Sequence, residues 1–171
     1  MALEIRRLEQ HDSVKDFDCG ERKLNDYLRQ YAWKNQQDNL TGVTYICVDN
    51  ERSTVVLGYY SLAVSSVPRL SLPETLTRDL PRYRDLPVAL LARLAVRKEF
   101  HDAGLGKALL ADACRRVVEL SKSTGCRFLI VDAYPSAEAW YRKFGFVPIE
   151  GTKPSETQTM FMDVKTLLPA L

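Results

Sequence analysis

The apolar and polar positions along the first third of the chain change their period, and each period predicts a different element. Two-residue alternation over residues 3–8 predicts a short half-buried strand. Two β-rich runs, residues 43–48 and 55–67, flank turn-forming residues at 49–53 and therefore predict a hairpin. Residues 21–39 have helical spacing, with one apolar face made of Leu24, Tyr27, Leu28, Tyr31 and Ala32.

The later part of the chain alternates between buried strands and helices. Residues 88–96 are apolar except for Arg93, which predicts a central strand buried on both faces. Ser136 and Gly145 are the expected start and end signals of a short helix. The remaining expected elements are a helix over 104–122, a strand over 126–133, the short helix over 136–144 and a last strand over 159–164. This alternation predicts an α/β or α+β sheet protein, and no repeat or linker divides residues 1–171, so one domain is expected.

Residues 68–87 interrupt the pattern because they contain four prolines, Pro68, Pro73, Pro81 and Pro87. Proline removes a backbone donor and fixes φ, so this stretch cannot form one regular element. We expect a long loop with at most a short helix, and loops of this length are often functional.

Composition narrows the class of protein. The chain has 171 residues, of which 46% are hydrophobic and 27% charged, as in a soluble globular protein. It has no apolar run long enough for a membrane span, and its charged N-terminus does not resemble a signal peptide. We therefore expect a cytoplasmic protein without a membrane partner. A zinc or other metal site and a disulfide framework are not expected, because the four cysteines are scattered and are best explained as buried free thiols: Cys19, Cys47, Cys114 and Cys126.

The net charge of +2 is unevenly distributed. Residues 1–65 have 8 basic and 10 acidic side chains, and residues 99–171 have 9 of each. Residues 66–98 have 7 basic and 3 acidic side chains, a net charge of +4. Clustered arginines favour phosphate recognition, which makes RNA a candidate partner. A solvated loop with incidental arginines is the alternative for Arg78, Arg82 and Arg84.

The most informative segment is a buried strand that enters a glycine-containing loop and then a helix, over residues 93–110. Glycine permits close backbone approach, and the first N–H groups of a helix have no partner, so phosphate is the expected ligand. A Walker loop is excluded because His101 and Ala108 stand where Gly and Ser or Thr are needed. A dinucleotide fingerprint also fails, since Leu109 occupies its third glycine position. A structural strand-to-helix loop remains the alternative.

The pattern His101-x-x-Gly104-x-Gly106 after a buried strand, followed by a helix with Tyr141, resembles the GCN5-related N-acetyltransferase (GNAT) superfamily. This resemblance implies a single mixed sheet of about six to seven strands flanked by about four helices. In that family the loop begins with Arg or Gln and binds the pyrophosphate of acetyl-CoA through backbone amides. Because His101 departs from that pattern, we expect backbone contacts and no side-chain contact at this position.

Further matches narrow the resemblance to the toxin branch of the superfamily. They are Phe17-Asp18-Cys19-Gly20, Gly58-Tyr59-Tyr60, Arg93-Leu94-Ala95-Val96 and Trp140-Tyr141 before Phe144-Gly145-Phe146. Such proteins acetylate the α-amino group of aminoacyl-tRNA, block translation, are restrained by a ribbon-helix-helix antitoxin and often form homodimers. Acetylation of a small-molecule or protein amine, or acetyl-CoA binding without turnover, are the alternatives.

The resemblance also implies roles for individual residues. Tyr141 matches the acid that protonates the coenzyme A thiolate, although its helical spacing also suits a core position. Arg93 is expected either to be paired inside or to face the acceptor, and Asn35 and Gln36 either contact the acceptor or form polar surface. The expected acetyl-CoA contacts are Leu94, Ala95, Val96, His101, Asp102, Ala103, Gly104, Leu105, Gly106, Lys107, Ala108 and Ala137.

Overall fold

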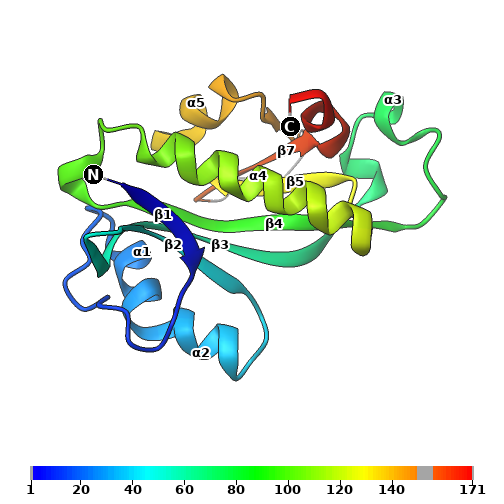
Figure 1. Cartoon of the computed structure of the whole chain (residues 1–171). Helices are drawn as coiled ribbons and strands as arrows, with labels where there is room; N and C mark the ends of the chain where they lie inside the picture. Colours follow the sequence, from blue (N-terminus) through cyan, green and yellow to red (C-terminus); the bar gives the residue numbers. More distant parts are fainter. Residues whose placement is uncertain (1, 150–155, 171) are drawn as a thin grey trace. The chain divides into compact units, whose positions relative to one another are not determined.

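The computed structural model describes residues 2–149 and 156–170. Seven strands form one mixed sheet in the order β1-β2-β3-β4-β5-β7-β6, which confirms the predicted fold class (Figure 1). The strands are β1 (Leu3–Arg7), β2 (Val43–Asp49), β3 (Arg52–Pro68), β4 (Asp85–Val96), β5 (Phe128–Ala133), β6 (Val147–Pro148) and β7 (Gln158–Asp163). The helices are α1 (Arg22–Asp26), α2 (Ala32–Gln37), α3 (Glu74–Thr77), α4 (Leu105–Ser123) and α5 (Pro135–Lys143).

The chain divides into two compact units. The first comprises Met1–Ala63 and Leu91–Arg115, and the second comprises Val64–Leu90 and Arg116–Leu171. That residues 1–171 form a single domain stays a prediction. Within the described residues, no helix is long and apolar enough to cross a membrane.

In the first unit, strands β1, β2 and β3 pair antiparallel, and the helical segment from α1 to α2 packs on them (Figure 1). A π turn, η1 (Tyr27–Tyr31), joins the two helices. The extra residue of this turn shifts the phase of the helix, so Tyr27 and Ala32, five positions apart, are both buried. It also places Tyr31 at 53% exposure, so the prediction that Tyr31 belongs to the buried face is wrong.

In the second unit, β5 pairs antiparallel with β7, which in turn pairs with the short β6. Aromatic and aliphatic residues of β5 and β7 form the core, with Phe128 and Phe161 in edge-to-face contact. α5 begins at Pro135, one residue before the expected cap, and Ser136 does not cap it. Proline suits the first position of a helix, since the N–H that it lacks would have no partner there. Gly145 ends the helix as expected, with a φ of +98°.

The remaining predictions for the elements were largely confirmed. Residues 68–87 contain only the 3-10 turn η2 (Arg69–Ser71) and α3 before β4 begins. β4 is buried at Val88, Ala89 and Leu91 but only half-buried from residue 92 to 94, so burial on both faces holds for its middle and not for its end. The two-residue β6 and the terminal 3-10 helix η4 (Val164–Ala170) were not predicted. All four cysteines are free and buried, as expected, and burial raises the pKa of each thiol.

Candidate active site

The glycine loop of the first unit has the geometry of an anion site. After β4 the chain forms a 3-10 turn, η3 (Lys98–Phe100), passes through Gly104 at a φ of +78°, and enters α4. A Cβ at Gly104 would meet no atom within 4 Å, so the backbone there is open to a ligand. The first turn of α4 carries no acidic residue and presents Lys107. Its unpaired N–H groups and the positive end of the helix dipole therefore suit the pyrophosphate of acetyl-CoA.

His101 replaces the longer residue expected at the start of the loop. Its ring Nε2 lies 2.8 Å from the carbonyl oxygen of Val96, the last residue of β4. With a proton on Nε2, the ring donates to that carbonyl and closes the loop onto the end of the strand. The side chain at this position therefore supports the shape of the loop.

Two short contacts with residues 16–18 fix the beginning of the loop. Lys98 Nζ lies 2.8 Å from Asp18 Oδ2, and the Lys98 backbone N–H donates to the Asp18 carbonyl at 2.9 Å. The Lys98 ammonium, then the Gly20 N–H and the Asn25 amide, hold the pKa of Asp18 well below its ordinary value. Arg97 donates to the Val56 carbonyl at 3.1 Å and pairs more loosely with Asp16 at 3.4 Å. These contacts were not predicted, because the partners are far apart in the sequence: Val56 lies 41 residues before Arg97, and the contacts with residues 16–18 span about eighty residues.

Gly58 on β3 allows the end of β4 and the start of α4 to approach closely. A Cβ at this position would lie 2.9 Å from Leu109 Cδ1 and 3.0 Å from the Ala95 carbonyl oxygen. Ala95 is buried, whereas Leu94 and Val96 on either side are half-buried. The motif around Gly58 is therefore explained by packing behind the strand that is expected to bind acetyl-CoA.

Arg93 was expected either to be paired inside or to face the acceptor, and the structure gives it an aromatic partner instead. Its guanidinium carbon lies 3.6 Å from the centre of the Tyr27 ring, and the side chain is half-buried. Within residues 2–149 and 156–170 it has no carboxylate partner. The ring therefore accommodates the charge by a cation–π contact, which leaves the donors at the edge of the guanidinium available to a ligand.

Asn35 and Gln36 lie at the end of α2 and differ in their surroundings. Gln36 is 3% exposed, and its amide donates to the Leu8 carbonyl and accepts from the Thr44 N–H, both at 3.0 Å. It thereby joins α2 to the residue that follows β1 and to β2. Asn35 is half-buried and accepts from Asn39 at 2.9 Å. Contact of either residue with the acceptor stays a prediction.

Tyr141 lies on α5 in the second unit and is 6% exposed. Its ring makes edge-to-face contacts with Trp140 at 5.0 Å and Phe146 at 5.4 Å between ring centres. Burial raises the pKa of Tyr141 far above its ordinary value, so the hydroxyl stays protonated at physiological pH. The hydroxyl therefore carries the proton that the predicted role needs, and that role stays a prediction. Ala137, one turn earlier on the same helix, is half-buried.

The predicted arginines of the proline-rich loop are exposed: Arg78, Arg82 and Arg84. Arg69 fixes this loop, since its guanidinium donates to the Pro81 carbonyl at 2.6 Å and also to the Thr77 carbonyl. The Arg69 backbone N–H donates to the Arg84 carbonyl at 2.9 Å. These contacts hold the loop around η2 and α3 in one shape.

Comparison with known proteins agrees with this geometry. A model of the acetyltransferase (GNAT) domain matches residues 41–148. The chain is 35% identical to a tRNA-acetylating toxin of Mycobacterium tuberculosis, with 95% of each chain covered. It is also similar to the solved structure of AtaT complexed with acetyl-methionyl-tRNAfMet, with a TM-score of 0.89, 29% identity and 99% of each chain covered.

A second solved structure contains a mutant AtaT toxin bound to the C-terminus of the antitoxin AtaR and to acetyl-CoA. Its TM-score is 0.80 at 25% identity, with 98% of this chain and 97% of that chain covered. The matched GNAT domain includes the glycine loop, α4 and α5. The chain therefore belongs to the GNAT family of acetyltransferases, which take the acetyl group from acetyl-CoA.

Proposed function

We propose that this protein transfers the acetyl group of acetyl-CoA to the α-amino group of aminoacyl-tRNA and so blocks translation. The observation that carries this proposal is the 35% identity to a tRNA-acetylating toxin over 95% of both chains. The exposed arginines of the proline-rich loop support it, because a small amine would not need a cationic surface.

The donor site is assigned to the end of β4 and the glycine loop. Residues 94–96 take the pantetheine arm and the thioester, and residues 101–108 take the pyrophosphate. The N–H groups of His101, Ala103 and Ala108 already donate to backbone carbonyls, so the other N–H groups of this segment are the proposed donors. Ala137 on α5 is a further proposed contact. Lys107 adds a positive charge beside the phosphates.

Tyr141 is the proposed acid. An α-amine titrates at about 7.7–8.0 in model peptides, so roughly a tenth of it is neutral near pH 7 and can attack the thioester without a strong base. As the C–N bond forms and the C–S bond breaks, the leaving thiolate needs a proton. The Tyr141 hydroxyl is protonated at neutral pH and is the proposed source of that proton.

The acceptor RNA is assigned to the exposed and half-buried cations. Arg78, Arg82 and Arg84 contact phosphates, and Arg93 presents its guanidinium edge while its face lies on Tyr27. Asn35 and Gln36 complete the proposed acceptor side, Gln36 through the strands that it holds in place.

The remaining parts of the proposal concern partners and location. AtaT, similar over nearly its whole length, binds the C-terminus of an antitoxin, and we propose a ribbon-helix-helix antitoxin for this chain. A homodimer is proposed as the active form. Because charged tRNA is used in the cytoplasm, that is the proposed compartment.

The deciding experiment incubates the protein with radiolabelled acetyl-CoA and a pool of aminoacyl-tRNAs, then identifies the N-acetylated amino acids released by mild hydrolysis. Label is expected on one or a few aminoacyl-tRNAs and absent from the same tRNAs after deacylation, which removes the amine. Label on a polyamine or a protein amine, with none on any aminoacyl-tRNA, would refute the proposal. Acetyl-CoA binding without any product would indicate a binding module.

A further inference from the structure

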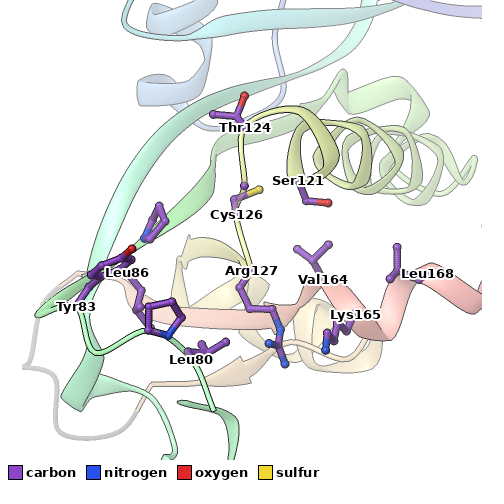
Figure 2. Close-up of a pocket in the computed structure, with 13 residues that line it drawn as sticks. Leu80, Tyr83, Leu86, Ser121, Thr124, Cys126, Arg127, Val164, Lys165 and Leu168 are labelled. Carbon is purple, nitrogen blue, oxygen red and sulfur yellow. The ribbon is translucent and has the colours of Figure 1, made fainter. Parts of the chain in front are cut away.

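The second unit contains a pocket that has no role in the chemistry described above. It has a volume of about 470 Å³, within the range of small-ligand sites, and lies between the proline-rich loop, the turn from α4 to β5, and η4 (Figure 2). Its walls are mostly apolar. They include Leu80, Pro81, Tyr83, Leu86, Val164 and Leu168.

The loop that carries Tyr83 is a fixed wall of this pocket. Arg69 binds the carbonyls of Thr77 and Pro81, and the Tyr83 N–H donates to the Pro81 carbonyl at 2.8 Å. Despite this, Tyr83 itself is 61% exposed. The backbone that carries this aromatic ring is thus fixed, although the ring does not pack in the core. A ligand can stack on the ring with little loss of conformational entropy, because the loop is already ordered.

The charged groups that line the pocket are both cations. Arg127 pairs with Asp163 through two contacts of 2.7 and 3.0 Å, and the Lys165 backbone N–H donates to the same carboxylate at 3.0 Å. In the view of Figure 2 the side chains of Arg127 and Lys165 extend in the same direction. Since Asp163 offsets Arg127, Lys165 supplies the uncompensated charge.

The sequence around Tyr83 adds to this charge. Arg82 and Arg84 stand on either side of it, and both are exposed. An exposed aromatic ring between two arginines, beside an apolar pocket with further cations, matches the chemistry of single-stranded nucleic acid, whose bases stack and whose phosphates bind cations. An acidic peptide would satisfy the cations but would leave the exposed ring unexplained.

We propose that this pocket holds an unpaired nucleotide of the RNA substrate, with its base against Tyr83 and the adjoining phosphates on Lys165, Arg82 and Arg84. The inference rests on the proposed function and names a recognition site for that substrate. Under this proposal Tyr83 binds the RNA and takes no part in acetyl transfer, so its replacement should change the KM for RNA and leave kcat unchanged.

The test compares Tyr83→Ala, Tyr83→Trp and Lys165→Glu with the control Leu70→Ala, which removes a side chain that is 96% exposed in the same unit and does not line the pocket. Tyr83→Ala is expected to raise the KM for aminoacyl-tRNA about tenfold. Tyr83→Trp is expected to keep the KM of the unmodified protein, because stacking needs only an aromatic face. Lys165→Glu is expected to weaken RNA binding and to reduce the salt slope by about 1 or more. The KM for acetyl-CoA and the behaviour of Leu70→Ala should stay as in the unmodified protein.

A second measurement is independent of catalysis. A short single-stranded RNA containing 5-iodouridine is bound, irradiated and digested, and the cross-linked peptide is expected to contain Tyr83. If no aminoacyl-tRNA is acetylated but this cross-link forms, the proposed function fails and the nucleotide site stands. Unchanged RNA affinity and an undiminished cross-link yield in Tyr83→Ala would overturn the site. So would a Tyr83→Ala variant that loses only the binding of a protein partner, because the pocket would then be a protein-docking site.

Discussion

The two compact units contribute different parts of the polypeptide to the proposed reaction. In the first unit the proposed chemistry lies in the backbone, because N–H groups of the loop around Gly104 and of the first turn of α4 are assigned to acetyl-CoA. In the second unit it lies in side chains, namely the Tyr141 hydroxyl and the cations around the proline-rich loop. The difference predicts how each unit tolerates change. A backbone site depends on shape and tolerates new side chains such as His101, whereas a side-chain site depends on the identity of single residues.

The largest effect should come from the smallest change in the second unit, Tyr141→Phe. The ring contacts with Trp140 and Phe146 remain, so the fold and acetyl-CoA binding should be preserved. Loss of the hydroxyl should lower kcat by about 10²–10⁴, the usual contribution of a positioned proton donor. Steady-state acetylation and isothermal titration with acetyl-CoA measure the two quantities separately.

The pH profile of the same reaction sharpens this prediction. Burial raises the pKa of Tyr141, so its protonated form is the one favoured in the folded protein and is lost only above the ordinary value of 10.0. The rate should therefore rise as the amine loses its proton and show no falling limb up to about pH 9. Tyr134→Phe, just before α5, is the control. Unmodified activity in Tyr141→Phe would show that the Tyr141 hydroxyl is not the acid, and the second unit would then contribute no catalytic side chain.

Periodicity predicted most of the elements because each period is a local property of the chain. The glycines of the loop predicted a phosphate site, and the arginine cluster predicted a cationic surface, because both patterns lie within short segments of the sequence. The π turn carried none, since a single extra residue in a helical segment is invisible in an apolar pattern that tolerates spacings of three or four. Tyr31 was therefore assigned to the wrong face.

Contacts between distant segments could not be predicted at all. The ion pair of Asp18 with Lys98 and the burial of Gln36 depend on which strands lie next to each other. Gln36 looks like surface in the sequence, because a polar residue at a helix end usually faces water. Tyr83 was missed for a similar reason: its neighbours in the pocket come from three segments that only the fold brings together.

A pair of glycine substitutions tests whether the backbone shape of the loop in the first unit controls acetyl-CoA binding. Gly104 and Gly125 have φ values of +78° and +85°, and a Cβ at either would meet no atom within 4 Å. Alanine at either position should thus lower the free energy of unfolding by a similar amount, about 1–2 kcal/mol, through backbone strain alone. Only Gly104→Ala should also raise the Kd for acetyl-CoA, by about tenfold or more, because relief of the strain displaces N–H groups that bind the phosphates. Equal weakening by Gly125→Ala would show that general stability, and not the shape of this loop, controls donor binding.

The smallest expected effect concerns the support of the loop. Asp18→Asn keeps an oxygen for the Gly20 N–H but removes the charge that Lys98 meets at 2.8 Å, so the Kd for acetyl-CoA should rise about 2- to 5-fold, as for an exposed ion pair. Asp16→Asn is the matched control, because its contact with Arg97 is longer, at 3.4 Å, and its side chain is 69% exposed. Lys98→Met should have the effect of Asp18→Asn, and the double variant should add nothing further.

The pH dependence of this ion pair has a definite sign. The pKa of Asp18 is lowered, chiefly by its hydrogen bond with Lys98, so the contribution of the pair is fully present above the ordinary value of 3.8 and is lost only as the pH falls through the lower folded value. The difference in Kd between Asp18→Asn and the unmodified protein should then be constant from pH 5 to 9, a range set by that shift. A difference that disappeared between pH 5 and 7 would mean that a side chain other than the Asp18 carboxylate controls the loop in place of the ion pair. The backbone site would in that case depend on the identity of one side chain, as the second unit does.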